Sequence, residues 1–530
     1  MLDGWAAWTK TGGLQSRALA LTLFAIWLCL EVILVRHHAF WRDEVRALSL
    51  ATRGDLISMI ESLRGEGHPA LWYLLIRGAY FSVGSSAVLW IVSVGVASAA
   101  ALLLVFRSPF GWPLLALFLF GRVALFEYSV MARNYGIGML LMFLFAACYE
   151  RYRDRSVVLG VLLFLLANTH ALSALLVGAF LLFWFVDVVN RQGLQWAAPL
   201  KTFLLNFAIA SAGVLAAFAT VYPPSADAIP IGMQQKGVEL TQIALAIFEP
   251  ARTFGELTRV FSWEAIGLGW LGNLIMSFVL FGSILGLVRS PGAFIAALGS
   301  LIGFSLFFTL VYPGYYRQEA LWLVFLLSMY WITREREVSS DQSQPVPKPI
   351  LWTRTVGSTL MVLLVATQLL GGFRAVADAA FDGLPQSRSR DFSNFIKDRP
   401  DLKDAIIIAD QDSLLEALPY YIDNSLYLMH EQRFGNVVTF TNKALISVNL
   451  DDIRNVAKKL NQERGKPVVI LLAHTLDPGQ PAKEYRESYS WKFAVTPEQV
   501  RRFLASTQLL VHFAPAKSDE SFDAYLFDGS

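Results

Sequence analysis

The stretch YGIGMLLMFLFAACYERYRDRSVVLGVLLFLLANTHALSALLVGAFLLFWFVDVVNRQ, residues 135–192, decides the fold. It contains three apolar runs, separated first by the strongly charged ERYRDR (150–155) and then by the short turn ANTHA (167–171). About 20 apolar residues are enough to cross a lipid bilayer as a helix, and shorter runs are tolerated when they pack among other helices. Alternating apolar runs and short polar turns therefore predict an α-helical multi-pass membrane protein.

The same pattern extends over residues 1–372. The chain of 530 residues is 55% hydrophobic and only 16% charged, whereas a typical soluble domain carries about 25% charged residues. This composition excludes a disordered chain, a coiled coil and an ordinary soluble enzyme, and a net charge of +2 gives no support for nucleic-acid binding. We expect eleven spanning helices, at 18–35, 86–106, 112–128, 135–149, 157–168, 171–189, 202–222, 268–288, 292–311, 318–333 and 355–372.

Residues 373–530 have a different composition. They carry 19 Lys/Arg and 22 Asp/Glu, about a quarter of their length, against 25 and 20 for residues 1–372. Strand-like runs alternate with helix-like segments, which favours a small α/β domain. The expected strands are 405–409, 425–429, 467–473 and 524–528, and the expected helices are 388–398, 411–421, 451–464 and 497–506. The segment 339–348, rich in Ser, Gln and Pro, is expected to be a cytoplasmic linker.

Positively charged residues predict the orientation in the membrane. If the short run 69–82, with Arg77 in its middle, lies in the interface and does not cross, 13 Lys/Arg gather on one side. The short turns on the other side carry only Arg133 and Arg317. Because basic loops stay in the cytoplasm, we expect a cytoplasmic N-terminus, an outside loop at 37–85 and an extracytoplasmic C-terminal domain at 373–530.

Polar residues from separate segments gather on this predicted outer side. They are Asp43 and Glu44 in HHAFWRDEVRALSLA (37–51), His68 in GEGHPALWYLL, Arg133 and Tyr135 in FEYSVMARNYG, His170 in ANTHA, and Tyr316 and Arg317 in YPGYYRQEALW. Singly, each has a structural explanation, such as a solvated loop charge, a helix start, a snorkelling arginine or an aromatic anchor. These explanations do not require a common side, so the shared position favours a functional site.

The residue types define a chemistry for such a site. A carboxylate can accept a proton from an attacking hydroxyl, arginines offer planar forks of donors to a phosphate, and histidines add a donor or a charge. The sequence has no Walker A motif and no GxGxxG motif after a strand, so nothing indicates a nucleotide site. The combination is suited to transfer of a group from a lipid phosphate at the membrane surface.

Four segments resemble a known family. They are WRDEVRALSLA, GHPALWYLLIRGAYFSVG, SVMARNYGIGMLLMFLFAACYERY and YYRQEALWLVFLLSMYWI, within about residues 15–335. Their order and spacing are similar to those of the C-type (GT-C fold) membrane glycosyltransferases that use polyprenyl-phosphate sugars. That family includes protein O-mannosyltransferases, lipid A aminoarabinose transferases and rhizobial lipopolysaccharide galacturonosyltransferases. The resemblance implies transfer of a sugar to an envelope glycolipid, polysaccharide or protein at the outer face of a bacterial cytoplasmic membrane, with inversion.

The resemblance also implies roles for single residues. Asp43 corresponds to the acidic residue that serves as catalytic base, and Glu44 is its companion. His68, Arg133, Tyr135, His170, Tyr316 and Arg317 correspond to positions around the donor phosphate, and a divalent cation near Asp43 is compatible with this pattern. The sequence departs from the family at Ala70, where a second proline is common, and at Gln318, where a histidine or tyrosine is common.

Other classes of function remain open at this level. A transporter or flippase of lipid-linked sugars would also hold a lipid phosphate with arginines, but it more typically shows internal repeats and polar groups near the bilayer midplane. A non-catalytic scaffold that displays the α/β domain would not require Asp43, Arg133 and Arg317 to share a side. A polysaccharide polymerase or ligase is a further alternative within enzymes.

Overall fold

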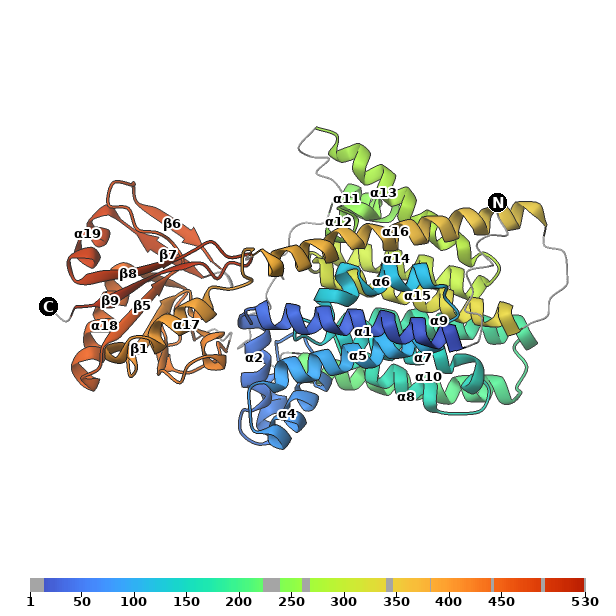
Figure 1. The fold of residues 1–530 in the computed structure, drawn as a ribbon, viewed down its shortest axis with the longest axis horizontal. Coiled ribbons are helices and arrows are strands. Elements are labelled where there is room, and N and C mark those ends of the chain that lie inside the picture. The colour runs from blue at the N-terminus through green and yellow to red at the C-terminus, as the bar shows by residue number, and fades with distance from the viewer. Residues whose placement is uncertain are drawn as a thin grey trace.

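The structure is a computed structural model that describes residues 14–222, 239–259, 267–339, 347–381, 383–439, 443–487 and 491–528. It is a multi-pass helical membrane protein in which a bundle of helices is followed by a C-terminal α/β domain (Figure 1). The two parts lie end to end, and α1 and α16 run along the bundle toward the α/β domain.

Each predicted apolar run lies on a helix of the bundle. Seven helices among the described residues are long and apolar enough to cross a membrane, judged by length and composition: α1, α5, α9, α10, α13, α14 and α16. The helices are α1 (Leu14–His37), α2 (Arg42–Ala51), α3 (Leu56–Ser62), α4 (Leu71–Val83), α5 (Val88–Arg107), α6 (Trp112–Leu119), α7 (Tyr135–Tyr152), α8 (Val158–Ala167), α9 (Ser173–Gln192), α10 (Ala198–Val221), α11 (Leu240–Phe248), α12 (Gly255–Thr258), α13 (Gly269–Ile284), α14 (Pro291–Leu310), α15 (Tyr316–Ser339) and α16 (Lys348–Ala380).

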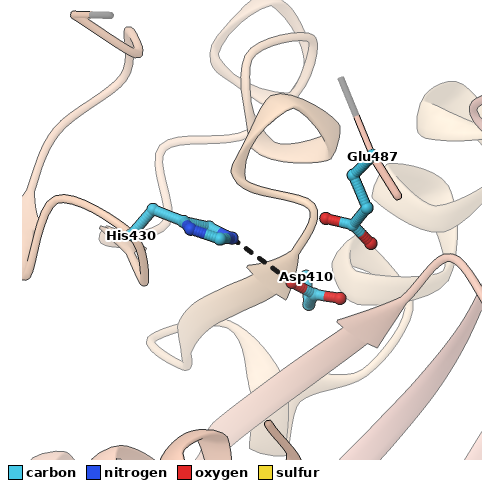
Figure 2. A group of neighbouring side chains, drawn as sticks. All are labelled: Asp410, His430 and Glu487. Atoms are coloured by element: carbon cyan, nitrogen blue, oxygen red, sulfur yellow. Dashed lines mark ion pairs between the residues drawn. The ribbon is translucent and has the colours of Figure 1, made fainter. Parts of the chain in front are cut away.

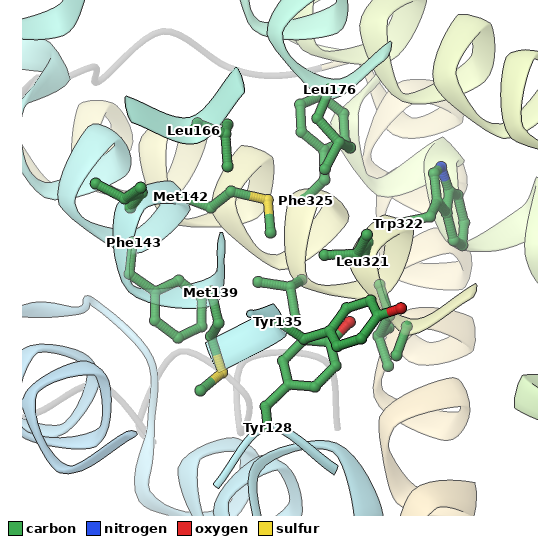
Figure 3. Packing of buried hydrophobic residues seen from close by; sticks show 14 of the residues in the cluster. Tyr128, Tyr135, Met139, Met142, Phe143, Leu166, Leu176, Leu321, Trp322 and Phe325 are labelled. Carbon is green, nitrogen blue, oxygen red and sulfur yellow. The ribbon is translucent and has the colours of Figure 1, made fainter. Parts of the chain in front are cut away.

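Two of the remaining predicted spans, α7 and α15, form the centre of the bundle. They pack against each other, and most of their side chains are buried by protein. Figure 3 shows Tyr135, Met139 and Phe143 of α7 facing the same core as Leu321 and Phe325 of α15. Neighbouring helices rather than lipid cover these two helices, so they need a less uniformly apolar sequence than a lipid-facing helix does.

The expected single span at 112–128 is wrong. The helix α6 ends at Leu119, and a short π-helical turn follows at Val123–Glu127. The break lies where α16 approaches closely, because a Cβ atom on Gly372 would lie 2.0 Å from the carbonyl oxygen of Phe120. Only glycine permits this approach, so the sequence of the run alone does not reveal the break.

Charged residues predicted to be cytoplasmic gather at one end of the bundle. Arg336 pairs with Asp187 at 2.7 Å, and Arg191 pairs with Asp154 at 2.8 Å. Arg336 lies 19 residues along α15 from Arg317, which corresponds to about 28 Å at 1.5 Å per residue. The two groups of polar residues therefore lie at opposite ends of α15, and which end faces the cytoplasm stays a prediction.

The described residues of the C-terminal domain form two sheets and three α-helices. The larger sheet has the strand order β3-β2-β1-β5-β9-β8, in which β1 pairs in parallel with both β2 and β5, and the smaller has the order β4-β7-β6. The elements are α17 (Ser389–Lys397), β1 (Ile406–Asp410), β2 (Leu426–Leu428), β3 (Arg433–Phe434), β4 (Ser447–Asn449), α18 (Leu450–Arg464), β5 (Val468–Leu472), β6 (Lys483–Arg486), β7 (Lys492–Val495), α19 (Pro497–Ala505), β8 (Thr507–Phe513) and β9 (Phe522–Phe527).

The four expected strands and three of the four expected helices are confirmed. The expected helix at 411–421 is wrong: two short 3₁₀ turns, Asp412–Leu415 and Leu418–Tyr420, occupy this segment. Pro419 has no backbone N–H and disfavours a continuous helix. The expected linker 339–348 falls mainly on residues 340–346, which lie outside the described residues.

Candidate active site

The helix α2 carries the Asp-Glu pair at the end of the bundle that faces the C-terminal domain (Figure 1). The carboxylate of Glu44 accepts a hydrogen bond from the backbone N–H of Trp41 at 3.2 Å, which caps the first turn. Acidic side chains in a first turn also interact favourably with the helix dipole. Since consecutive residues of an α-helix point about 100° apart, Asp43 and Glu44 face different surroundings.

Glu44 is fully buried and joins two loops. Its carboxylate lies 2.8 Å from Nε2 of His38 and accepts from the backbone N–H of Ala132 at 2.6 Å. Together with the bond from Trp41, these contacts fix α2 against the turn that precedes α7. Both carboxylate oxygens of Glu44 are thus occupied by contacts that hold α2 in place.

Asp43 lies among arginines and keeps 35% of its side chain exposed. Its carboxylate forms an ion pair with Arg133, lies 3.9 Å from Nε of Arg42 and also feels the charge of Arg317. Burial acts to raise the pKa of Asp43, but the three arginines outweigh this effect and hold the pKa well below its usual range. The group is therefore an ionised carboxylate at neutral pH.

Two histidines lie behind Arg133. Its guanidinium donates to Nε2 of His68 at 2.9 Å, and the rings of His68 and His170 lie 4.9 Å apart. The hydroxyl of Tyr135 lies 3.2 Å from Nε2 of His170, whose Nδ1 accepts from a backbone N–H at 3.0 Å. Burial and the charge of Arg133 lower the pKa of His170 to about 3, and burial, His170 and Arg133 lower the pKa of His68. Both imidazoles are neutral, so the positive charge of the site comes from arginines.

Arg317 begins α15 beside the same cluster. Its guanidinium lies 5.3 Å from the ring centre of Trp41 and 3.9 Å from the carboxylate of Glu127. The hydroxyl of Tyr128 donates to the backbone carbonyl of Arg317 at 2.6 Å, which fixes the start of the helix. Nη1 of Arg317 is buried and has no hydrogen-bond partner among the described residues. A buried donor without a partner is costly, so this atom is available for a ligand.

Tyr316 points away from Asp43. Its hydroxyl donates to the side-chain oxygen of Gln368 at 2.6 Å, and the guanidinium of Arg122 lies 3.8 Å from its ring centre. Arg122 in turn forms an ion pair with Glu127 at 2.7 Å. Tyr316 therefore belongs to a layer of residues beneath Arg317 and does not contact the carboxylate of Asp43.

The C-terminal domain contacts the side of α2 that lies opposite Glu44. Arg46 forms ion pairs with Glu66 of the same loop and with Glu416 of the C-terminal domain, and it donates to the carbonyl of Val438 at 2.9 Å. The backbone N–H of Arg42 donates to the carboxylate of Glu520 at 2.8 Å. The helix that presents Asp43 is thus clamped between the bundle and the α/β domain.

The structure brings six of the eight predicted site residues into one cluster at the end of the bundle: Asp43, His68, Arg133, Tyr135, His170 and Arg317. Within the described residues, the side chains of Glu44 and Tyr316 do not bind those of the other six; they bind neighbouring residues that hold the cluster in place. Sequence reasoning did not single out Arg42 and Trp41, which also contact it. The one feature of the sequence that points to these two residues is their position directly before Asp43.

Neither a protein-family model nor a curated protein matches the chain. Solved structures similar to it include two of the same protein. ArnT from Cupriavidus metallidurans in the apo state is 12% identical, with a TM-score of 0.44 over 97% of this chain and 98% of that one. The same protein bound to undecaprenyl phosphate is 13% identical, with a TM-score of 0.42 over 99% and 98%. These values are too low to support conclusions about function, which rest on the side chains described above.

Proposed function

We propose that the protein is an inverting glycosyltransferase that moves a sugar from a polyprenyl-phosphate donor to an acceptor hydroxyl at the outer face of the cytoplasmic membrane. The observation that carries this proposal is the cluster at the end of the bundle. It places one ionised carboxylate, Asp43, among three arginines, and one of these, Arg317, has an unpartnered donor. This buried donor, next to Arg133, favours an anionic ligand such as a lipid phosphate.

Donor binding would change the state of Asp43. In the structure its carboxylate is paired with Arg133, which makes it a weak base. A donor phosphate that engages Arg133 and Arg317 takes that cation away from Asp43, and the pKa of the carboxyl then rises toward its ordinary value. The base therefore becomes available when the donor is bound, which couples donor binding to activation of the acceptor.

The transfer itself is a single displacement. The acceptor oxygen forms a bond to the anomeric carbon as the bond from that carbon to the phosphate oxygen breaks, and the acceptor proton goes to Asp43. The leaving polyprenyl phosphate gains negative charge, which Arg133 and Arg317 stabilise in a preorganised setting. His68, His170 and Tyr135 are neutral and hold Arg133 in position.

The proposal includes a divalent cation near Asp43 that binds only together with the donor. The near neighbours of the carboxylate are guanidinium groups, which do not ligate metals. An ion at this place would be held by Asp43 together with the donor phosphate. Loss of turnover on chelation, restored by added Mg²⁺ or Mn²⁺ and dependent on bound donor, supports the ion, and undiminished turnover in chelator contradicts it.

The test uses the purified protein in lipid with a synthetic polyprenyl-phosphate sugar, and it measures donor binding and turnover separately. Arg317→Lys keeps the charge but loses the planar fork, and we expect both variants, Arg317→Lys and Arg317→Ala, to lose activity. For Arg317→Ala the expected loss of turnover is about 10²–10³-fold. The matched control is Arg53→Lys, an exposed arginine in the loop at 37–85 that also carries Asp43. Unchanged binding and turnover in both Arg317 variants would remove this residue from the site.

Donor binding without any transfer by the unmodified protein would contradict the enzyme and favour a transporter.

The orientation is tested by cysteine labelling of intact cells. In a background without Cys29 and Cys148, we expect an impermeant reagent to label Lys458→Cys, an exposed position on α18, and to miss Arg153→Cys. The reason is the gathering of basic residues at the end of the bundle that contains Arg153. Labelling at position 153 would reverse the orientation and place the Asp43 cluster in the cytoplasm.

A further inference from the structure

A second cluster of buried ionisable side chains lies in the C-terminal domain, far along the chain from Asp43. Figure 2 shows His430 pointing toward Asp410, with Glu487 on the other side of that carboxylate. Nε2 of His430 lies 3.5 Å from Oδ1 of Asp410, and one ligand atom from each of the three residues lies within 4.8 Å of the other two. The exposed fractions are 0% for Asp410, 1% for His430 and 9% for Glu487.

The topology of the sheet places this cluster at a position where ligands bind in α/β domains. Asp410 is the last residue of β1, and the chain continues from β1 to β2 on one side and then to β5 on the other. Both neighbours pair with β1 in parallel, so the order reverses between β1 and β5, at their carboxyl ends. Clefts at such switch points are the usual binding sites of open α/β sheets.

The cluster lacks the positive charge that its carboxylates need. Both oxygens of Asp410, both oxygens of Glu487 and Nε2 of His430 are buried without a hydrogen-bond partner among the described residues. Within that part of the chain, the ion pairs found for these two carboxylates involve only histidines, His430 at 3.5 Å and His474 at 3.6 Å. Burying charged groups without partners costs several kcal/mol. Without a cation, burial and the neighbouring Glu487 therefore raise the pKa of Asp410, and the two carboxyls would share a proton.

His430 is oriented as a metal ligand. Its Nδ1–H donates to the carbonyl of Leu445 at 2.6 Å, which leaves the lone pair of Nε2 directed at Asp410. The imidazole stacks on the indole of Trp491 with ring centres 4.0 Å apart and planes 9° apart. A second hydrogen bond from the far ring nitrogen is the usual way in which proteins fix a metal-binding histidine.

The neighbouring carboxylate of Asp412 has hydrogen-bond partners for both of its oxygens and serves as a comparison. Asp412 is equally buried, and it accepts from the backbone N–H groups of Met429 at 2.5 Å and His430 at 2.9 Å. These bonds hold the segment that carries His430. Asp412 therefore explains the local fold, whereas Asp410, two residues earlier, has no comparable structural role.

We propose that the C-terminal domain binds one divalent transition-metal ion through the carboxylate of Asp410, Nε2 of His430 and the carboxylate of Glu487. One imidazole and two carboxylates form a donor set that Zn²⁺ and similar ions accept, and that binds Zn²⁺ with ligand distances near 2 Å. A cation of charge +2 also balances the two carboxylates. His474 follows β5 and lies beside Glu487, at the second strand of the switch point.

The test measures metal binding by the full-length protein in detergent. We expect the protein purified without chelator to retain about one metal ion per chain by elemental analysis. Chelation should lower the midpoint of thermal unfolding by several degrees, and added Zn²⁺ should restore it. We expect His430→Gln and Glu487→Gln to bind Zn²⁺ at least about tenfold more weakly in calorimetry.

Two controls separate this site from general effects of substitution. Glu484→Gln lies on β6, three residues before Glu487, with 55% of the side chain exposed, and His512→Gln lies on β8 with 58% of the side chain exposed. Both should bind Zn²⁺ as the unmodified protein does. The metal content of the unmodified chain tests the proposal even if a ligand variant fails to fold.

Two outcomes would overturn the proposal. The first is an unmodified protein that holds no metal and binds no Zn²⁺ at micromolar concentration. The second is a pair of carboxyls that share a proton instead of a metal. In that case Glu487→Gln would stabilise the protein, and neither Zn²⁺ nor chelator would shift the unfolding midpoint of the unmodified chain.

Discussion

The two buried polar clusters of this protein differ in the sign of the charged groups that lack partners. Around Asp43, three arginines lie close to one carboxylate, and Arg42 and Arg317 also lie near Asp519 and Glu127. Among the described residues, Nη1 of Arg317 is a buried donor without a hydrogen-bond partner. Around Asp410, the ion pairs of two carboxylates within the described part of the chain are with imidazoles, and their oxygens have no hydrogen-bond partner there. In the first cluster the group without a partner belongs to a cation, and in the second the groups without partners are mainly carboxylate oxygens.

This difference indicates the kind of ligand that completes each cluster. Buried charges are tolerated when they are paired and hydrogen-bonded, so the sign of the unpaired groups gives the sign of the missing partner. An anion such as a phosphate fits the cluster at the end of the bundle, and a divalent cation fits the cluster in the α/β domain. The same principle yields two proposals that can fail separately, since no residue belongs to both clusters.

The largest expected effect concerns the base at the end of the bundle. Asp43→Asn should keep the fold and lose about 10²–10⁴-fold in turnover, because the amide cannot accept the proton. The measurement is transfer from a synthetic polyprenyl-phosphate sugar by purified protein in lipid. The control is Asp55→Asn, the same substitution at the exposed N-cap of α3, where asparagine caps as well as aspartate. If Asp43→Asn retains turnover while Glu44→Gln does not, the two roles are exchanged.

The second prediction concerns the link between the two regions. Arg46→Ala leaves the buried carboxylate of Glu416 without its guanidinium partner, which should cost about 3–5 kcal/mol of stability. Thermal or denaturant unfolding in detergent measures the loss, and turnover should fall as well because α2 loses one side of its clamp. Arg53→Ala, an exposed arginine just past the end of α2, should change stability by less than about 0.5 kcal/mol. Equal stability of the two variants would show that the domains are not held together through Arg46.

The third and smallest effect is a pH dependence at the interface. Burial raises the pKa of Glu520 to about 7, against a partial lowering by the charge of Arg42. Because the folded state then holds the proton more tightly than the unfolded state, stability is greatest below the unfolded pKa and falls as the pH rises through about 7. We expect a loss on the order of 1–3 kcal/mol from pH 5 to pH 8, which Glu520→Gln should reduce.

The control for that measurement is Glu498→Gln, in the same domain with 74% of the side chain exposed. It should leave the pH profile of unfolding unchanged. Stability that rises with pH in this interval, or an identical profile for Glu520→Gln and the unmodified protein, would contradict the assignment to Glu520.

The sequence predicts the helical bundle well because apolar runs are continuous features of the chain. It also predicts that Asp43, Arg133 and Arg317 share one end, because each follows or precedes such a run. The resemblance gives Asp43 as the base and Glu44 as its companion, but the sequence does not show how their surroundings differ, since this depends on where the helix points each side chain. The break after Leu119 depends on the close approach of Gly372 from another helix, which no local pattern encodes.

The cluster in the C-terminal domain was not predicted from the sequence, although one part of it was visible. The run IIIAD ends an apolar strand with an aspartate at the carboxyl edge of the sheet. His430 and Glu487 follow two other strands, β2 and β6, which belong to different sheets. Only the order of the strands brings these three side chains together, and that order depends on contacts distant in the sequence.

The clamp on α2 has a consequence for how the protein is made. Arg42 is held by Glu520, 478 residues further along the chain. At a synthesis rate of about 5–20 residues per second, the ribosome reaches Glu520 roughly 20–100 seconds after Arg42. During that interval the loop that carries α2 is already synthesised without its final contacts. A nascent chain that stops before the last strands would therefore be inserted, yet its Asp43 helix would lack its anchor, so the site is completed only at the end of translation.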